Sequence, residues 1–371
     1  MYIQKIHLNQ FRNHEKISLE LFKRPTVFHG LNGSGKTNIL EAISLFTVGK
    51  GLRSATYDEM GMNDNFNRTW DIRLQMGDDD LPSIDCSVHY RDKKRLNYIQ
   101  GNPVQSSKSF NEWITLFWLT CEHDRLFIDS SKARRKFLDR MVFNIDSQHA
   151  QHLAAYEKLS KERLSLLENG HFNSSWIESI EQHMHEYAFK IYISRSQIID
   201  HINHETQNLD PIFPKLTLSL TGEYESIHKE HTSEIASKLI KEKWVQSRHM
   251  DQQRHMTHFG VHRSDLNVLH HVKGNADQCS TGEQKILLMG LVLSFLSHRM
   301  KTDERLILVL LDECLSHFDF RHRMVLFKQI EKFYQSDQYL GSMHVFMTGT
   351  DRVAFEPLES FATYHEIGHN I

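Results

Sequence analysis

Hydrophobic and polar residues alternate in two segments near the start of the chain. Ile17, Leu19 and Leu21 are separated by polar residues, and the run from 84 to 91 alternates in the same way. A period of two predicts strands that bury one face. We therefore expect residues 1–120 to form an antiparallel sheet around one helix, packed on one side. A turn at 100–103 is expected to close a hairpin.

The pattern becomes helical between residues 132 and 204. Six apolar residues there are spaced by three, four or seven positions: Ile177, Ile180, Met184, Tyr187, Ile191 and Ile198. This heptad-like stripe predicts one long helix. An upstream helix that ends near Gly170 would complete a helical hairpin. The stripe can be the seam of a local bundle or a dimer interface, and the hairpin is too short for a long coiled-coil arm.

Two later segments are apolar without alternation. Residues 306–311 (LILVLL) and 345–349 (VFMTG) predict fully buried strands of a parallel sheet. The chain therefore passes from β-rich to helical and back to α/β. We predict one domain built from residues 1–120 and 255–371, with residues 121–254 inserted as a helical lobe.

Composition narrows the class of protein. The net charge of −3 means that any surface for nucleic acid must be a local patch. The four cysteines lie far apart without a CxxC pair, which argues against a zinc knuckle or a disulfide framework and suits a reducing cytosol. The first residues are too polar for a signal peptide, and no apolar run approaches the ~20 residues that cross a bilayer. We expect a cytoplasmic protein without a membrane partner.

A glycine-rich segment follows a short strand-like run at residues 26–28. Residues 30–37 read GLNGSGKT and match the pattern GxxxxGK[ST]. Glycines let the backbone point several N–H groups at phosphate oxygens, and the helix that follows adds its dipole. Lys36 would reach the β- and γ-phosphates, and Thr37 would bind Mg²⁺. The alternative is a glycine turn before a helix. The predicted nucleotide-binding residues are Gly30, Leu31, Asn32, Gly33, Ser34, Gly35, Lys36, Thr37 and Asn38.

The buried strand at 306–311 delivers two acids. Asp312 and Glu313 follow it directly, an arrangement that resembles a Walker B element. Asp312 would then hold Mg²⁺, and Glu313 would orient or deprotonate the attacking water. The residues leave these two roles of Glu313 open. We take Glu313 and Lys36 as the candidate catalytic residues.

A polar segment precedes the apolar helix predicted at 286–296. Ser280 and Glu283 have the spacing of a capping box, which also forms an anion site at a helix N-terminus. The segment resembles the signature motif of ABC-type ATPases, and Ser316 and Asp319 lie where those proteins carry the D-loop. The signature residues are Ser280, Thr281, Gly282, Glu283 and Gln284.

The whole chain resembles the RecF family of DNA-repair ATPases, relatives of the ATPase heads of SMC proteins. The matching segments are LNQFRNH at 8–14, the P-loop, GLRS at 51–54, RRKFLD at 134–139, GVHRSDL at 260–266, the signature and the Walker B element. The resemblance implies an α/β fold, an ABC-type, SMC-head-like P-loop ATPase domain with an inserted helical lobe.

Two positions depart from the family pattern. Cys121 and Val261 stand where the family often has proline, Cys121 near the expected Q-loop. Residues 347–350 contain no switch histidine, and the family generally lacks it too. The resemblance therefore implies slow hydrolysis.

The function implied by the resemblance is ATP-dependent DNA binding in recombinational gap repair. Such a protein would bind duplex, gapped and single-strand/duplex junction DNA without sequence preference. In ABC-type folds the signature contacts the ATP of a partner subunit, so ATP and Mg²⁺ would induce a homodimer, which weak DNA-stimulated hydrolysis would release. The resemblance also implies helping RecO and RecR load RecA, with consequences for replication restart and the SOS response.

Two basic runs, at 91–95 and 132–140, are candidates for DNA contacts, and each can equally be a solvated face. The selected residues are Lys93, Lys94, Arg95, Arg134 and Lys136. Three other functions are considered. A metabolic P-loop kinase would need no signature motif, an SMC-type structural ATPase would need a longer coiled coil, and a transporter ATPase would normally carry the switch histidine.

Overall fold

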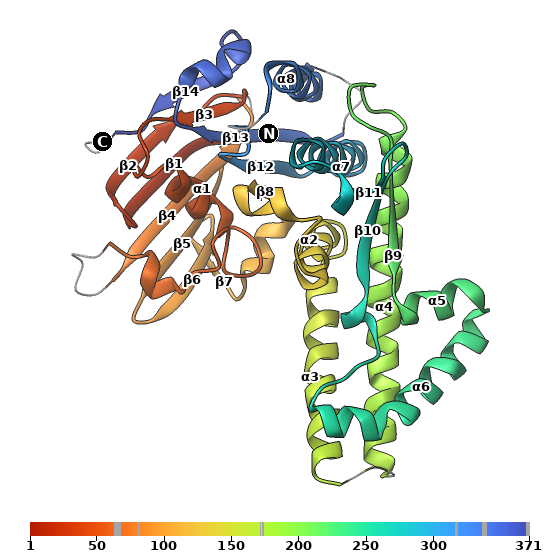
Figure 1. The fold of residues 1–371 in the computed structure, drawn as a ribbon. Helices are drawn as coiled ribbons and strands as arrows, with labels where there is room; N and C mark the ends of the chain where they lie inside the picture. The colour runs from red at the N-terminus through yellow and green to blue at the C-terminus, as the bar shows by residue number, and fades with distance from the viewer. Residues whose placement is uncertain are drawn as a thin grey trace. The chain divides into compact units, whose positions relative to one another are not determined.

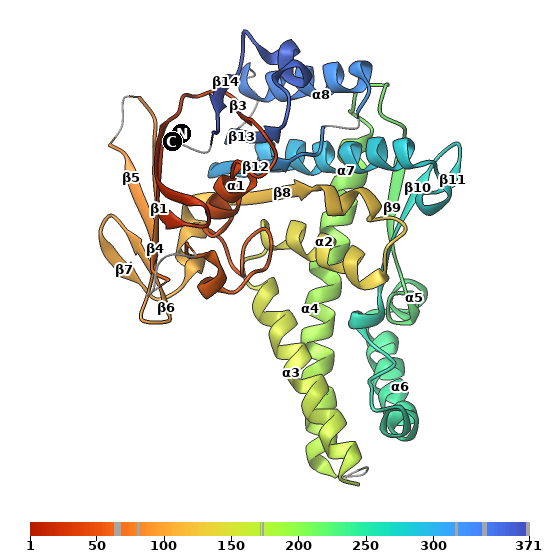
Figure 2. The ribbon, with the colours of Figure 1, turned by 60° about the vertical axis from the view of Figure 1, so that its left-hand side comes forward.

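The computed structural model describes residues 1–62, 68–79, 82–170, 172, 174–315, 318–335 and 340–368. The chain divides into two compact units (Figures 1 and 2). The first unit contains Met1–Asp124 and Leu296–Ile371, and the second contains Arg125–Phe295. The predicted α/β class is confirmed, because the chain combines a parallel sheet with many helices.

The first unit contains an antiparallel sheet in the order β2-β1-β4-β5-β6-β7. Its strands are β1 (Tyr2–Phe11), β2 (His14–Glu20), β4 (Trp70–Gly77), β5 (Ile84–Arg91), β6 (Lys94–Ile99) and β7 (Asn102–Val104). Alternate residues such as Ile6, Leu74 and Val88 are buried, as the sequence alternation predicts. Gln100 and Gly101 form the expected turn with positive φ angles of 52° and 76°.

A parallel sheet in the order β14-β3-β13-β12-β8 forms the rest of the first unit. Its strands are β3 (Thr26–His29), β8 (Ile114–Thr120), β12 (Leu306–Asp312), β13 (Ser342–Gly349) and β14 (Thr363–Glu366). Every residue of β8 and β12 is buried, which explains why their sequences show no alternation. Helix α1 (Lys36–Ser44) packs into one hydrophobic core with residues of both sheets, and α8 (Phe320–Gln335) precedes β13.

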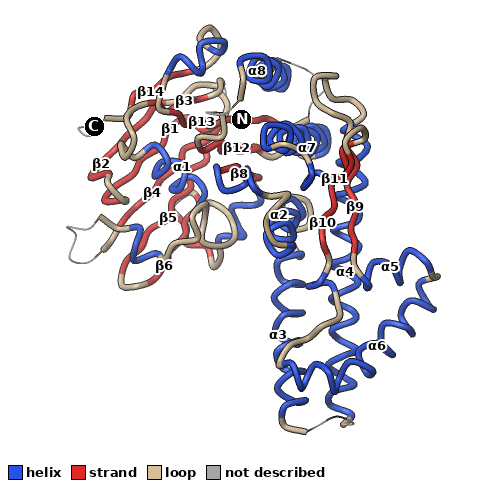
Figure 3. The backbone as a smooth tube through the Cα atoms, in the orientation of Figure 1, coloured by secondary structure: helices blue, strands red, loops and turns tan. Residues whose placement is uncertain are grey.

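Helices dominate the second unit, as Figure 3 shows. They are α2 (Ser131–Phe143), α3 (His149–Glu168), α4 (Ser175–Thr206), α5 (Glu223–Glu230), α6 (Ser233–Arg254) and the start of α7 (Thr281–Thr302). The predicted helical hairpin is formed by α3 and α4. The apolar stripe of α4 is buried with Tyr156, Leu166 and Trp244 in one cluster, so it is the seam of a local bundle.

The second unit extends beyond the predicted lobe of residues 121–254. The reason is a small sheet in which β9 (Leu216–Thr221) pairs antiparallel with β10 (Asp265–His270), and β10 pairs with β11 (Gly274–Asn275). This pairing places residues 265–275 with the helices of the second unit. The second unit ends at Phe295, within α7, whereas the sequence predicts the return to the first domain at residue 255.

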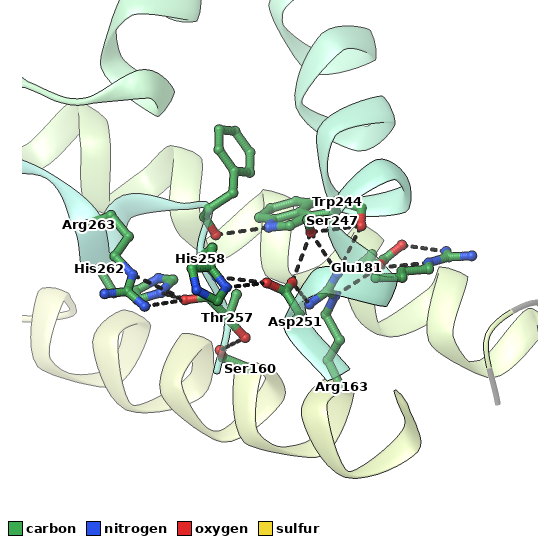
Figure 4. A network of polar contacts seen from close by, with 12 residues as sticks. Ser160, Arg163, Glu181, Trp244, Ser247, Asp251, Thr257, His258, His262 and Arg263 are labelled. Carbon is green, nitrogen blue, oxygen red and sulfur yellow. Dashed lines mark hydrogen bonds and ion pairs between the residues drawn. The ribbon is translucent and has the colours of Figure 1, made fainter. Parts of the chain in front are cut away.

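A buried polar network joins three helices of the second unit (Figure 4). Arg163 on α3 has no exposed surface, and its guanidinium binds Glu181 on α4 at 2.8 Å and Asp251 on α6 at 2.6 Å. Arg163 also donates to the backbone oxygen of Trp244 at 2.8 Å. Arg248 forms a two-pronged contact with both carboxylate oxygens of Glu181, at 3.1 and 2.6 Å. Each buried charge is thus paired and hydrogen-bonded.

A buried histidine gives the first unit a defined response to acid. His344 on β13 accepts a hydrogen bond from the backbone N–H of Ile3 at 3.2 Å through Nδ1, and its Nε2 lies 3.1 Å from Thr26 Oγ1. Since Nδ1 is an acceptor, the ring is neutral and Nε2 donates to Thr26. Burial lowers the pKa of His344 to about 3.

We predict that the first unit loses stability as the pH falls below the unfolded-state pKa of histidine. The folded protein keeps His344 neutral down to about pH 3, whereas the unfolded chain takes up a proton below about pH 6.5. Each pH unit in this window should cost about 1.4 kcal/mol of unfolding free energy. Denaturant unfolding at pH 7 and pH 5 measures the loss. His344→Gln should reduce the dependence of the unfolding free energy on pH by about one proton. An unchanged dependence would contradict the assignment of this loss to His344.

Candidate nucleotide-binding site

The P-loop connects β3 to the N-terminus of α1. Gly30, Gly33 and Gly35 have φ angles of 146°, 82° and 103°, which side chains rarely tolerate. A Cβ atom on Gly35 would lie 2.5 Å from both Asn13 Oδ1 and His14 Nε2, and one on Gly30 would lie 2.4 Å from a backbone oxygen. Glycine is therefore required by space as well as by backbone conformation at positions 30 and 35.

The Lys36 side chain folds back into this loop. Its ammonium donates to the backbone oxygens of Gly30 and Leu31, each at 2.9 Å. Burial lowers the pKa of Lys36, while the negative charges of Glu313 and Asp312 oppose that change. The loop thus holds a desolvated cation where an anionic ligand would bind.

Asp312 at the end of β12 receives two hydroxyl groups. Thr37 Oγ1 on α1 and Thr348 Oγ1 on β13 both donate to Asp312 Oδ1, each at 2.8 Å. The backbone N–H of Glu313 donates to Thr348 Oγ1 at 2.9 Å, and Glu313 has a φ of 55°. Thr348 therefore fixes both predicted acids. The sequence reasoning missed it, because residues 347–350 were searched only for a histidine.

The residues of the P-loop and the end of β12 fit a nucleotide with a bound Mg²⁺ ion. The Ser34 hydroxyl is buried in the loop and has no hydrogen-bond partner among the described residues, so a phosphate oxygen would satisfy it. The Thr37 hydroxyl and the Asp312 carboxylate are the hard oxygen ligands that Mg²⁺ prefers. The described residues contain no group of three or more His, Cys, Asp or Glu able to hold a metal. Two protein oxygens with phosphate and water are the usual complement of such a magnesium site.

The turn between β1 and β2 supports the P-loop. His14 Nε2 lies 3.1 Å from the backbone oxygen of Gly35, and Asn13 donates to the backbone oxygen of Gly33 at 3.4 Å. Arg12 forms a two-pronged contact at 2.8 and 2.6 Å with Glu41 of α1, which has no exposed surface. The segment 8–14, which carried part of the family resemblance, thus holds the loop and its helix in place.

The predicted capping box at the start of α7 is confirmed. The backbone N–H of Ser280 donates to Glu283 Oε2 at 3.0 Å, and that of Glu283 approaches Ser280 Oγ at 3.5 Å. A hydrogen bond and ion pair with Lys273 lower the pKa of Glu283 to about 2. Gln284 is buried and donates to a backbone oxygen, whereas Ser280, Thr281 and Gly282 are exposed. These residues belong to the second unit, and the P-loop and Asp312 belong to the first.

Two further motifs lie after β12 and β8. Asp319 caps α8 by accepting hydrogen bonds from the backbone and ring of His322, at 2.9 and 2.8 Å. Ser316, the other predicted D-loop residue, lies outside the described residues. Cys121 Sγ lies 3.8 and 3.7 Å from the backbone oxygens of Asp312 and Glu313, so the expected Q-loop contacts the Walker B end.

The basic candidates separate into two groups. Arg95 donates to Asn97 and to the Tyr57 hydroxyl at 2.9 and 3.1 Å, and its guanidinium lies over the Tyr57 ring. Arg134 forms a two-pronged contact with Asp265, with both distances 2.7 Å. Both guanidinium groups therefore have partners within the chain. The remaining three candidates are exposed: Lys93, Lys94 and Lys136.

None of the helices in the described part of the chain combines the length and apolar character needed to cross a bilayer.

Comparisons with known proteins agree with this arrangement. The model of the RecF/RecN/SMC N-terminal domain matches residues 2–348. The DNA replication and repair protein RecF of Mesorhizobium japonicum is 34% identical over 375 residues, covering 99% of this chain and 96% of the relative.

Two solved structures share the fold. The recombination mediator protein RecF-ATPrS in the RecFOR pathway has a TM-score of 0.81 at 22% identity, covering 95% of this chain and 93% of its own. The SMC head bound to the C-winged helix domain of ScpA has a TM-score of 0.53 at 14% identity, covering 96% and 92%. The predicted ABC-type, SMC-head-like fold is therefore confirmed.

Proposed function

We propose that this chain, which belongs to the RecF family of DNA replication and repair proteins, is an ATP-dependent DNA-binding protein of recombinational gap repair. The observation that carries the proposal is the meeting of Lys36, Thr37 and Asp312 at the N-terminus of α1. A solved structure with the same fold is that of the recombination mediator protein RecF-ATPrS, which supports ATP as the nucleotide. The family match leaves the kinase and transporter alternatives without support.

Some residues of the site would bind the nucleotide and Mg²⁺, and others would take part in hydrolysis. Lys36 would exchange its two backbone oxygens for phosphate oxygens, and Ser34 would gain a partner for its buried hydroxyl. Thr37 and Asp312 would hold Mg²⁺. ATP supplies the γ-phosphate whose loss reverses the switch. Glu313, held by the hydrogen bond to Thr348, would orient or deprotonate water. Residues 347–350 include no histidine, which agrees with slow hydrolysis.

ATP-induced pairing of two copies is the proposed response to the nucleotide. Ser280, Thr281 and Gly282 are exposed at the N-terminus of α7, and a Cβ atom on Gly282 would meet nothing within 4 Å. A helix N-terminus left open in this way suits a γ-phosphate held by another subunit. Each ATP would then be bound by the P-loop of one copy and the signature of its partner.

We predict that Glu313→Gln is a dimer with ATP and Mg²⁺ and a monomer without them. The substitution slows hydrolysis and leaves the Thr348 contact to the backbone intact, so the bound state persists. Sedimentation velocity measures the mass. Adding Ser280→Arg should return the protein to a monomer, whereas Ser226→Arg, at an exposed position on α5, should not. A monomer in the presence of ATP and Mg²⁺ would rule out the dimer.

DNA binding is proposed to be electrostatic and independent of sequence, on duplex, gapped and junction DNA. We predict tight binding to a gapped duplex only with ATP and Mg²⁺, weakened by salt. The double change Lys93→Ala and Lys94→Ala should lower the salt slope by about two, since each lysine that meets a phosphate contributes about one. Fluorescence anisotropy at several salt concentrations measures the slope. Lys238→Ala is the exposed control, and binding indifferent to salt and to ATP would overturn the proposal.

The wider role follows from the family. We propose that the protein acts in the cytoplasm with RecO and RecR to help load RecA at gaps, in support of replication restart and the SOS response. The solved RecF-ATPrS structure, which belongs to the RecFOR pathway, supports this setting.

A further inference from the structure

The outer face of the antiparallel sheet contains a polar hollow to which none of the roles above belongs. Its volume is about 750 Å³, and it lies across β4, β5 and β6. Arg73, Ser87, His89, Arg91 and Tyr98 line it. The paired residues of neighbouring strands point to the same side of a sheet, so these side chains face the same solvent-filled space.

Ser87, His89 and Asp71 form a hydrogen-bonded chain in this hollow. Ser87 Oγ lies 2.9 Å from His89 Nε2, and His89 Nδ1 is hydrogen-bonded to Asp71 Oδ1. An ionised carboxylate can only accept, so Nδ1 carries the proton and Nε2 presents its lone pair to the serine hydroxyl. This is the order of contacts by which a serine, a histidine and an aspartate activate a nucleophile.

The aspartate is held in its ionised form. The hydrogen bond from His89 lowers the pKa of Asp71 to about 2, against the effect of burial. Asn9 donates to Asp71 Oδ2 at 3.2 Å, and Arg91 approaches both carboxylate oxygens at 3.2 and 3.4 Å. Three groups from two strands, β1 and β5, thus fix the carboxylate that orients the imidazole.

Donors flank the serine on both sides. Arg73 on β4 and Tyr98 on β6 are the direct cross-strand neighbours of Ser87. Cross-strand neighbours have Cβ atoms about 5 Å apart, within reach of a group bound at the hydroxyl. The Arg73 guanidinium pairs with Asp85 through Nε and Nη2. Its remaining N–H groups and the Tyr98 phenol can donate to an oxygen that gains negative charge.

We propose that Ser87 is a nucleophile that hydrolyses small carboxylic esters bound in the hollow. Ser87 Oγ attacks the ester carbonyl carbon, and its proton passes to His89 Nε2. The carbon–oxygen bond to the leaving group breaks, and the alcohol leaves with that proton. Water, deprotonated by His89, then attacks the acyl carbon. The bond from that carbon to Ser87 Oγ breaks, His89 returns the proton to Ser87 Oγ, and the carboxylic acid is released. Asp71 is a positioning residue, which keeps the imidazole in the required tautomer.

A fluorophosphonate probe tests the nucleophile directly, because it forms a serine–phosphorus bond with loss of fluoride. The full chain is treated with the probe, and the modified residue is identified by mass spectrometry. Labelling of Ser87 in the native protein, absent after heat denaturation, is the expected result. Ser18 is the matched control within the same chain, because Ser18, His7, Arg73 and Ser87 are consecutive cross-strand neighbours.

Two variants test the assigned roles. His89→Gln should lower the labelling rate and the hydrolysis of p-nitrophenyl acetate by about a hundredfold or more, the usual worth of a general base. Asp71→Asn should lower both by a similar factor while the melting temperature and ATP affinity stay unchanged. Lys36→Ala should leave labelling intact, so a failure of the nucleotide site is told apart from a failure here. The proposal is overturned if Ser87 of the native protein is labelled no faster than Ser18. It is also overturned if Ser87 is labelled as fast in His89→Gln as in the unaltered protein.

Discussion

Lys36→Ala is expected to weaken ATP binding by about a hundredfold or more. The ammonium is buried in the P-loop and is held by the backbone oxygens of Gly30 and Leu31. Removing it takes away the cation that faces the phosphates, and loss of one partner of a desolvated charge pair typically costs ~2–5 kcal/mol. A loss of ~3 kcal/mol corresponds to about a hundredfold in Kd. Titration with a fluorescent ATP analogue measures the affinity.

Two further variants separate the effect of the positive charge at position 36 from the effect of side-chain shape. Lys36→Arg keeps the positive charge, but the larger guanidinium cannot occupy a loop closed around an ammonium, so it should also bind weakly. Lys50→Ala removes an exposed lysine from the segment that follows α1 and should bind normally. An affinity for ATP that is the same in Lys36→Ala as in the unaltered protein would refute the site.

The local part of this site could be predicted from the sequence. The glycines, Lys36 and Thr37 follow one another within eight residues, so their chemistry depends only on a strand, a turn and a helix in succession. Thr348 could not be predicted in the same way. It meets Asp312 because β12 and β13 are parallel neighbours, and this pairing joins segments that are 36 residues apart. Only the order of the strands brings the hydroxyl to the carboxylate.

Charged residues show the same limit of prediction from local sequence. In sequence, the runs around Arg95 and Arg134 look like any solvated basic face. Arg134 instead pairs with Asp265, which is 131 positions away, and Arg95 packs on Tyr57. The C-terminal boundary of the helical unit depends likewise on the pairing of β9 with β10, which no local sequence pattern indicates. The helical hairpin was predictable because its apolar spacing is a property of the helix itself.

Arg163→Ala is expected to lower the unfolding free energy of the second unit by about 3–5 kcal/mol, the usual cost of removing one partner of a buried ion pair. The change leaves Glu181 and Asp251 buried with fewer partners. Burial alone would raise the pKa of Asp251, but hydrogen bonds from Arg163 and His258 hold it below its ordinary value. Without Arg163, the network in Figure 4 loses its link between α3 and the other two helices.

Denaturant unfolding followed by the helical circular dichroism signal measures this loss. Lys161→Ala is the matched control, because it removes an exposed cation from the same helix two residues away and should change stability by less than about 0.5 kcal/mol. Asp251→Asn with Arg163→Met removes both charges of one ion pair and leaves Glu181 paired with Arg248, so it should be less destabilising than Arg163→Ala. If Arg163→Ala unfolds like Lys161→Ala, the network does not stabilise the helical unit. The stability of this unit would then come from the apolar seam of α4 alone.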